Sequence, residues 1–302
     1  MYDSIIIGGG PAGISAAIYL GRKRMKILLL TQDYGGQSSK AAEVANYLGF
    51  KQTTGPELVG KFQEHLENLE VENMVEEVKT VEKTATGFLV KTREKSFETK
   101  TVLVCSGKAP KHLNVKGEEK FTGKGVSYCA ICDAPLFRDK VVVVVGGGNS
   151  ALDAALELEK HAQTVYIVNI GPEIQGDAIM KEKFEQSPKS KVLNDAKTTE
   201  IYGKEMVEGL KYEDQKTREI KNLACEGIFV EIGWTSSTGF LKNLVKLNNL
   251  QEIEVDKNGM TSCPGIFAAG DVTDTPFKQI IIAAGEGAKA ALSAWKYLIT
   301  LK

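Results

Sequence analysis

Two cysteines three positions apart, Cys129 and Cys132, have the spacing in this chain that most directly suggests chemistry. A C-x-x-C spacing lowers the pKa of a thiol and lets a disulfide form and break reversibly within a small loop. Asp133 follows the pair directly. This carboxyl can serve as a general acid for a departing thiolate or as the cap of a following turn, and the residues alone leave both roles open.

The same spacing also occurs in half of a structural zinc site, which needs four ligands. The other three cysteines are isolated in the sequence, and the three histidines show no ligand spacing. We therefore expect a redox pair and no metal site.

Two glycine-rich turns have the pattern that holds a dinucleotide. In a G-x-G-x-x-G turn the first glycine makes the bend and the second lets the backbone approach a pyrophosphate. The third lets the helix pack against the strand, so that the helix N-terminus faces the phosphates. The first turn has Gly8, Gly10 and Gly13, with Pro11 and Ala12 between them. The second has Gly146, Gly148 and Ala151, with Asn149 and Ser150 between them. A single match also occurs in ordinary strand-helix connections, but two in the same context favour two dinucleotide sites.

Each turn follows an apolar strand and precedes a helical pattern and a second apolar strand. The predicted ranges are 4–7, 14–20 and 26–30 for the first unit, and 141–145, 152–158 and 164–168 for the second. Continuously apolar strands of this kind are typical of parallel sheets covered on both faces. A hairpin or meander is expected over 84–104, and a long helix at the C-terminus. The sequence thus predicts an α/β fold with two Rossmann-like domains and soft boundaries near 111–118 and 238–246.

Composition limits the possible partners. The 302 residues are 42% hydrophobic and 25% charged, with a formal net charge of −1, which fits a soluble globular protein of two domains. No like-charge block favours nucleic acid or anionic lipid, and no apolar run approaches a membrane span. Met1–Ile7 lacks a basic leader, so we expect no signal peptide. Five sparse cysteines fit a reducing cytoplasm.

Taken together, these motifs resemble the low-molecular-weight thioredoxin reductases, and most closely the reductase portion of the alkyl hydroperoxide reductase flavoprotein subunit. The resemblance covers essentially the whole chain. Besides the two glycine turns it rests on Gly35-Gly36-Gln37, Asn46-Tyr47, Tyr128–Asp133, Ala269-Gly270-Asp271 and Lys278-Gln279.

The resemblance implies that the second domain is inserted into the first. The implied bounds are 1–114 and 242–302 for an FAD domain and 115–241 for a nicotinamide domain that carries the cysteines. Cys132 would face the flavin, Cys129 would attack an external disulfide, and Asp133 would be the acid. The inserted domain would swing between two states, and the protein would be a homodimer. The implied FAD contacts are Gly8, Gly10, Pro11, Ala12, Gly13, Gly36, Gln37, Asn46, Gly270, Asp271, Lys278, Gln279 and Ile280. The implied nicotinamide contacts are Gly146, Gly148, Asn149, Ser150, Ala151 and Asn169.

Departures from the family pattern bear on the electron donor. NADPH-specific members carry a His-Arg-Arg-x-x-x-Arg run where this chain reads Asn169–Gln175, without any arginine. A 2′-phosphate would find no cation there, so NADPH is disfavoured and NADH favoured. NADH-using members have an acid at the position of Asn169, so the match to that pattern is also incomplete. Two further family motifs are altered, to Cys105-Ser106-Gly107 and to Gly233–Thr238.

Three functions follow for testing. The first is an NADH-dependent disulfide reductase acting on a thioredoxin or glutaredoxin-like protein. The second is the same reductase fed by reduced ferredoxin or flavodoxin, and the third is a non-enzymatic, FAD-loaded redox sensor. The first glycine turn begins at Gly8 and there is no second C-x-x-C. We therefore expect electrons to leave Cys129 for a separate carrier chain.

Overall fold

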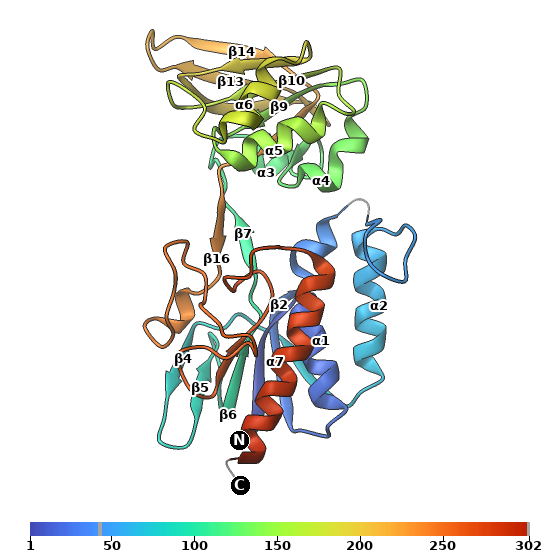
Figure 1. The fold of residues 1–302 in the computed structure, drawn as a ribbon, viewed down its shortest axis with the longest axis vertical. Helices are drawn as coiled ribbons and strands as arrows, with labels where there is room; N and C mark the ends of the chain where they lie inside the picture. Colours follow the sequence, from blue (N-terminus) through green and yellow to red (C-terminus); the bar gives the residue numbers. More distant parts are fainter. Residues whose placement is uncertain (42–43, 301–302) are drawn as a thin grey trace. The chain divides into compact units, whose positions relative to one another are not determined.

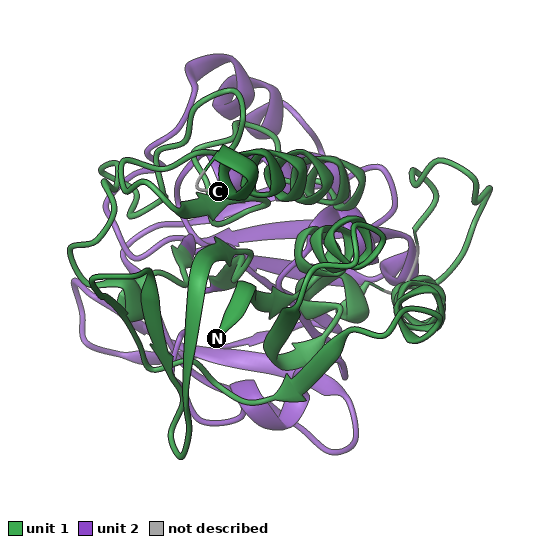
Figure 2. Ribbon diagram, turned by 90° about the horizontal axis from the view of Figure 1, so that it is seen from below, with its two compact units in different colours: residues 1–109, 235–302 green, residues 110–234 purple. Residues whose placement is uncertain are grey.

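The computed structural model describes residues 1–41 and 44–300, and it divides into two compact units (Figures 1 and 2). Unit 1 comprises residues 1–109 and 235–302, and unit 2 comprises residues 110–234. Unit 2 is therefore inserted into unit 1, in an α/β fold with two Rossmann-like parts. The boundaries expected from the sequence lie a few residues further along the chain at both crossings.

Unit 1 is built around a mainly parallel sheet. Strand β1 (Tyr2–Gly9) pairs in parallel with β2 (Ile27–Tyr34) and β6 (Ser96–Val104). Strands β3 (Glu72–Val75) and β17 (Ile266–Ala268) extend it in parallel, and β5 (Phe88–Lys91) and β4 (Thr80–Lys83) continue it as an antiparallel meander. The resulting order, β3-β2-β1-β6-β5-β4 with β17 beside β6, joins strands from both ends of the chain.

Both faces of the unit 1 sheet are covered, which explains its apolar strands. Helices α1 (Pro11–Gly21), α2 (Gly55–Glu67) and α7 (Ile280–Thr300) lie on one side of the sheet (Figure 1). Ile6 packs toward α1 and α7, whereas its neighbours Ile5 and Ile7 pack in a second cluster with Leu241 and Ile253. Helix α7 approaches α1 closely, because a Cβ at Gly287 would lie 2.0 Å from the Ala12 carbonyl oxygen.

Unit 2 has a fully parallel sheet in the order β11-β10-β9-β15-β8. These strands are β8 (Val126–Ser127), β9 (Val141–Val145), β10 (Thr164–Val168), β11 (Ser190–Leu193) and β15 (Gly227–Val230). Helix α5 (Asn149–Leu158) packs on the Val142 and Val144 face, beside α6 (Ala178–Glu185). The opposite face packs on an antiparallel meander of β12 (Ala196–Gly203), β13 (Val207–Asp214) and β14 (Ile220–Ala224).

The chain crosses between the units twice, through β7 (Lys108–Pro110) and β16 (Trp234–Ser236), which pair with each other. The remaining elements are single turns: η1 (Gly36–Lys40), α3 (Glu118–Phe121), α4 (Ala130–Asp133), η2 (Ala134–Phe137) and η3 (Gly239–Leu241). Among the described residues, no helix is both long and apolar enough to span a bilayer.

Candidate active site and nucleotide sites

The first glycine turn has the geometry that a bound pyrophosphate needs. Gly8 has a φ of +112°, and a Cβ there would lie 2.2 Å from the Cys105 carbonyl oxygen. A Cβ at Gly13 would lie 1.8 Å from the Gly8 carbonyl oxygen, so α1 can pack this closely only on glycine. In contrast, a Cβ at Gly10 would meet no atom closer than 4.0 Å. Protein atoms therefore occupy the space beside Gly8 and Gly13 where a side chain would lie. The space over Gly10, at the N-terminus of α1, is left for a ligand.

The second turn repeats this arrangement in unit 2. Gly146 has a φ of +154°, and a Cβ there would lie 2.3 Å from the Glu231 carbonyl oxygen. Above Gly148 the nearest atom to a Cβ would be the Gln175 carbonyl oxygen at 3.8 Å. Ala151 takes the third position and is buried against the strands. Each unit thus carries one turn that fits a dinucleotide pyrophosphate.

In each unit a polar side chain from the second strand, or from the residue directly after it, contacts the turn. In unit 1 the Gly9 N–H donates to Thr31 Oγ1 at 2.8 Å. In unit 2 the buried Asn169 occupies the corresponding place, where a Cβ on Gly147 would lie 2.1 Å from Asn169 Oδ1.

The Asn169 amide is engaged within its own loop. Its Nδ2 donates to the Gly171 carbonyl oxygen at 3.1 Å and to Asn194 Oδ1 at 3.0 Å, and its Oδ1 accepts the Gly171 N–H at 3.2 Å. Asn169 therefore lies beside the turn, and these bonds hold the loop that follows β10. Its contact with a ribose remains a prediction.

Asn149 also makes a contact that the sequence did not suggest. Its Oδ1 accepts the Asp177 N–H at 2.7 Å, and the Asp177 carboxylate caps α6 by accepting the N–H groups of Ile179 and Met180. Ser150 beside it is exposed at the start of α5. Within unit 2, Asn149 thus joins the second turn to α6.

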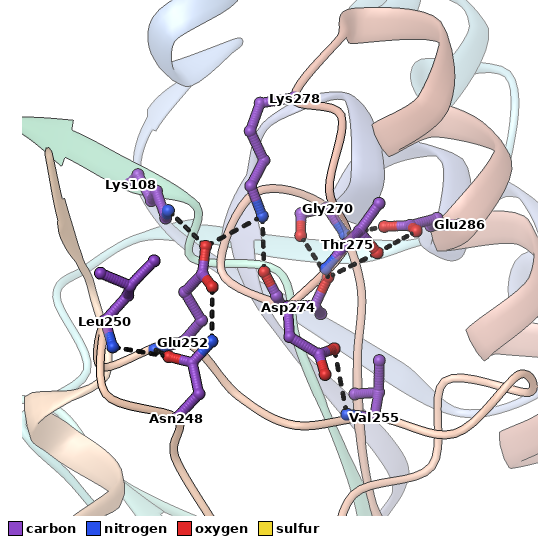
Figure 3. Close-up of polar contacts among 11 residues, drawn as sticks. Lys108, Asn248, Leu250, Glu252, Val255, Gly270, Asp274, Thr275, Lys278 and Glu286 are labelled. Atoms are coloured by element: carbon purple, nitrogen blue, oxygen red, sulfur yellow. Dashed lines mark hydrogen bonds and ion pairs between the residues drawn. The ribbon is translucent and has the colours of Figure 1, made fainter. Parts of the chain in front are cut away.

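The C-terminal part of the predicted FAD site is held by a polar network in unit 1 (Figure 3). The Gly270 N–H donates to Glu286 Oε2 at 2.9 Å. Lys278 Nζ donates to the Thr273 carbonyl oxygen at 2.6 Å and lies 3.2 Å from Glu252 Oε1. Lys108 Nζ reaches the same Glu252 oxygen at 2.5 Å. Lys278 is therefore fixed by protein contacts on the chain segment that leads into α7.

Other predicted FAD residues converge in unit 1 from distant parts of the chain. Asn46 Nδ2 donates to Gln279 Oε1 at 3.2 Å. A Cβ at Gly36 would meet only the Gly10 Cα, at 4.0 Å. The backbones at Gly36 and Gly10 therefore border the same open space. Burial raises the pKa of Asp271, and the nearby Lys278 and Lys108 oppose that rise. Pro11 and Ala12 begin α1, Gln37 lies in η1, and Ile280 begins α7.

Cys129 and Cys132 form a disulfide across the single turn α4 in unit 2. Both cysteines are half-buried, and the apolar side chains of Ile131 and Leu136 beside them are 72% and 60% exposed. The other three cysteines are free and buried. The described residues contain no cluster of three or more His, Cys, Asp and Glu side chains that could hold a metal.

Polar groups around the pair include several that sequence reasoning missed. The Ser127 hydroxyl donates to Asp133 Oδ2 at 2.7 Å, and its oxygen accepts the Cys129 N–H at 3.1 Å. Burial, reinforced by Asp153, raises the pKa of Glu231 to about 8, and the Ala130 N–H opposes that rise. No motif marks Ser127 or Glu231, because their roles depend on the fold that brings them to α4.

A buried carboxylate organises the other side of the redox loop. Glu118 accepts the Leu113 N–H at 2.9 Å and the Asn114 N–H at 2.7 Å. It also accepts the hydroxyl of Tyr128, which precedes Cys129 and lies 2.9 Å from His112 Nδ1. Burial raises the pKa of Tyr128 to about 12, so this phenol keeps its proton.

Two dinucleotide turns on parallel sheets, together with a surface disulfide, define an oxidoreductase that couples nucleotide and disulfide chemistry. Sequence comparison agrees, since the family model for pyridine nucleotide-disulphide oxidoreductases matches residues 2–287. The chain belongs to that family. Its membership implies FAD and a pyridine nucleotide as cofactors, and the open glycine turns fit both.

Individual relatives sharpen the comparison. The chain is 41% identical to an alkyl hydroperoxide reductase subunit of Pseudomonas putida and 40% identical to an NADH dehydrogenase of Bacillus subtilis. In both cases 99% of this chain is matched, but it spans only 58% and 59% of those proteins. The crystal structure of thioredoxin reductase from Streptococcus pyogenes matches 99% of both chains at 36% identity, with a TM-score of 0.88. The chain is thus similar over nearly its whole length to a thioredoxin reductase and to part of two longer proteins.

Proposed function

We propose that this protein takes electrons from NADH through FAD to the Cys129–Cys132 disulfide, and from there to the disulfide of a thioredoxin-like protein. The observation that carries the proposal is the disulfide itself, which lies at the surface of the same unit as the second nucleotide turn. Relatives named alkyl hydroperoxide reductase, NADH dehydrogenase and thioredoxin reductase support the same class of chemistry.

The residues of each unit have separate tasks in this proposal. Those of the first turn, with Asn46, Asp271 and Gln279, would hold FAD, which carries two electrons from a nicotinamide to a disulfide. The second turn would hold the nicotinamide nucleotide. Cys132 would receive the electrons, Cys129 would attack the partner disulfide, and Asp133 would supply the proton that a departing thiolate takes up.

NADH is the proposed donor because the loop after β10 has no cation of its own. Lys181 on α6 reaches this loop, where its Nζ is 4.0 Å from Glu173 Oε2. A 2′-phosphate would have to compete with Glu173 for that charge. We expect NADH to reduce the flavin at least tenfold more efficiently than NADPH, a difference of about 1.4 kcal/mol.

Stopped-flow bleaching of the flavin under anaerobic conditions tests this donor choice. Glu173→Gln should release Lys181 and narrow the preference for NADH. Glu182→Gln is a matched control on α6, because the Glu182 side chain bonds Gln186 instead of the loop. Equal rates with NADH and NADPH in the unaltered protein would contradict the proposal.

The alternative is an electron donor other than a nicotinamide, and the hydrogen bonds that already occupy the Asn169 amide favour it. The Asn169 amide is bonded to Gly171 and Asn194, and this residue, which directly follows β10, is itself uncharged. If neither nicotinamide bleaches the flavin, reduced ferredoxin or flavodoxin should do so and should support turnover of a partner disulfide.

The proposed partner is a thioredoxin or glutaredoxin-like protein that docks on the apolar side chains flanking the disulfide. Leu136→Ser should raise the KM for the partner and leave flavin bleaching unchanged, because exposed apolar side chains stabilise docking mainly by losing contact with water. Ile220→Ser is the control, because Ile220 is an exposed apolar residue of β14.

Turnover of a peroxiredoxin should require an added thioredoxin-like carrier protein. Full peroxiredoxin turnover without a carrier would exclude the carrier step.

A further inference from the structure

Three hydrogen bonds close a ring around the redox loop. The Cys129 N–H donates to Ser127 Oγ at 3.1 Å, and the Ser127 hydroxyl donates to Asp133 Oδ2 at 2.7 Å. The Asp133 N–H returns to the Cys129 carbonyl oxygen at 3.2 Å. Ser127 ends β8 and is 7% exposed, so the sheet fixes its position.

The Ser127 hydroxyl also has a second acceptor within reach. Its oxygen lies 3.4 Å from the Cys129 carbonyl oxygen, compared with 2.7 Å from the Asp133 carboxylate. A hydroxyl has one proton to donate and two lone pairs with which to accept. The bond to a charged acceptor is the stronger one, so the proton points to Asp133 while that carboxyl is ionised.

Protonation of Asp133 would reverse this bond without breaking the ring. The new carboxyl O–H would donate to Ser127 Oγ, which would then accept from both Asp133 and Cys129. The serine proton would turn to the Cys129 carbonyl oxygen. Every polar group of the ring would keep a partner in both states, which avoids the cost of a buried group without a hydrogen bond.

We propose that Ser127 is a positioning residue that keeps Asp133 hydrogen-bonded in both its ionised and its protonated form. This inference rests on the proposed role of Asp133 as the acid. When the disulfide is reduced, its S–S bond breaks, and two electrons from the nicotinamide and two protons give two thiols. Asp133 delivers one of those protons and regains it from solvent. Ser127 keeps the carboxyl in place through that cycle.

The test is the pH dependence of disulfide reduction by dithiothreitol in the purified holoprotein, expressed per dithiothreitol thiolate. This assay uses neither a nicotinamide nor a partner protein, so it is independent of the proposed donor and acceptor. In the unaltered protein the rate should fall as the pH rises and Asp133 ionises. The pH–rate profile of Asp133→Asn should lack this descending limb. Ser127→Ala should move this descending limb to higher pH by about one unit, because the ionised Asp133 loses the hydrogen bond that the serine hydroxyl donates to it.

Two further variants separate positioning from simple structural support. Ser127→Thr keeps a hydroxyl and should restore the profile of the unaltered protein. Ser187→Ala makes the same chemical change in unit 2, where the hydroxyl contacts only the Lys189 N–H among the bonds described, and should change nothing.

Other titratable groups near α4 must be held constant. Glu231 has a pKa of about 8 and is influenced by Asp153 on α5, while Tyr128 keeps its proton, and the facing strand β9 contains only valine. The profiles should therefore be repeated in a Glu231→Gln background, where the displacement caused by Ser127→Ala should persist.

Several results would overturn the inference. One is a Ser127→Ala limb that coincides with that of the unaltered protein, and another is an equal loss of rate at every pH in both Ser127 variants. A limb that survives in Asp133→Asn would remove Asp133 as the acid and this role of Ser127 with it. Failure of NADH or thioredoxin to react would contradict the proposed function alone.

Discussion

Cys129 and Cys132 are chemically alike, and their surroundings must decide their different tasks. Ser127 and Asp133 are bonded to the backbone of Cys129, and Tyr128 precedes it on the side of Glu118. Cys132 lies at the other end of the turn, next to the exposed Ile131. The polar contacts are therefore concentrated on Cys129, the cysteine proposed to exchange with the partner.

The cysteine pair should be needed for thiol output but not for reduction of the flavin. Cys132→Ser removes the disulfide and leaves both nucleotide turns intact, so NADH should still bleach the flavin. Reduction of a partner disulfide should fall below detection. Cys225→Ala, a change to a buried free cysteine of the same unit, is the control. A Cys132→Ser protein that reduces the partner at the unaltered rate would refute the assigned route.

Glu231 should make the stability of the protein depend on pH. Its pKa is about 8 in the folded protein, against an ordinary value of 4.5. Between these values the folded protein holds a proton that the unfolded chain releases. The free energy of unfolding therefore falls as the pH rises through this window, and the loss is complete above pH 8.

Glu231→Gln removes this titration. Relative to the unaltered protein, it should be more stable at pH 9 than at pH 5 by on the order of 4 kcal/mol. Chemical denaturation at the two pH values measures the difference. Glu226→Gln is the control, because Glu226 directly precedes β15, at the opposite end of the strand from Glu231. It should change the free energy of unfolding by the same amount at the two pH values. An identical pH dependence in Glu231→Gln and the unaltered protein would exclude this titration.

At the scale of elements, the contact between α1 and the first turn is the one most easily broken. Gly13→Ala places a methyl group where the Gly8 carbonyl oxygen is only 1.8 Å away, so α1 must move from its strand. We expect a loss of bound FAD and a destabilisation on the order of 3 kcal/mol. The flavin-to-protein absorbance ratio and the melting temperature measure both effects.

Gly60→Ala is the matched control for this change. Gly60 is an exposed residue of α2, and a Cβ there would meet no atom within 4 Å. The substitution should keep the flavin and raise helix stability by about 1 kcal/mol. A Gly13→Ala protein that keeps its full flavin content would show that the turn tolerates a displaced helix.

The long elements could be predicted because their burial is visible in the residues. Strands β9 and β10 are covered on both faces, so β9 is apolar throughout and β10 largely so, and a glycine turn lies at the end of β1 and of β9. The short turns η1 and η3 have too few residues for any periodicity. The crossing strands β7 and β16 pair only because two distant segments meet, which sequence patterns do not report.

The candidate site was predictable to a similar degree. The backbone conformation at positions 8 and 146 requires glycine, so a local sequence motif reveals these two residues. The partners of Asn149 and Asn169 are Asp177 and Asn194, distant residues that only the fold brings near. Hydroxyls such as that of Ser127 carry no local signature. The sequence therefore identifies the chemistry better than it identifies the groups that hold the chemistry in place.

At the scale of the whole molecule, each unit has its own hydrophobic core. Val144 and Phe229 belong to one core cluster of unit 2, and Ile228 and Leu210 to the other, with no member from unit 1. A fragment of residues 110–234 should therefore fold alone. We expect cooperative thermal unfolding and a Cys129–Cys132 disulfide that dithiothreitol reduces at the rate of the full chain.

Circular dichroism and thiol counting measure these properties. The control is a fragment of residues 140–234, which lacks β8 and the redox loop but keeps most of the sheet. It should unfold at a lower temperature, because the edge of β15 that β8 covers is left unpaired. Broad, non-cooperative melting of the longer fragment would show that unit 2 depends on unit 1 for its fold.

The paired crossing strands also have an evolutionary consequence. On one side of the crossing, the Lys111 N–H donates to the Gly233 carbonyl oxygen at 2.9 Å, and on the other the Ser237 N–H donates to the Gly107 carbonyl oxygen at 3.1 Å. In each unit, the two points where the chain enters and leaves are thus already adjacent. Joining these two points with a short loop would cost little entropy in either unit. An ancestral gene could therefore gain, lose or exchange the middle segment as a cassette while the flanking halves went on folding together.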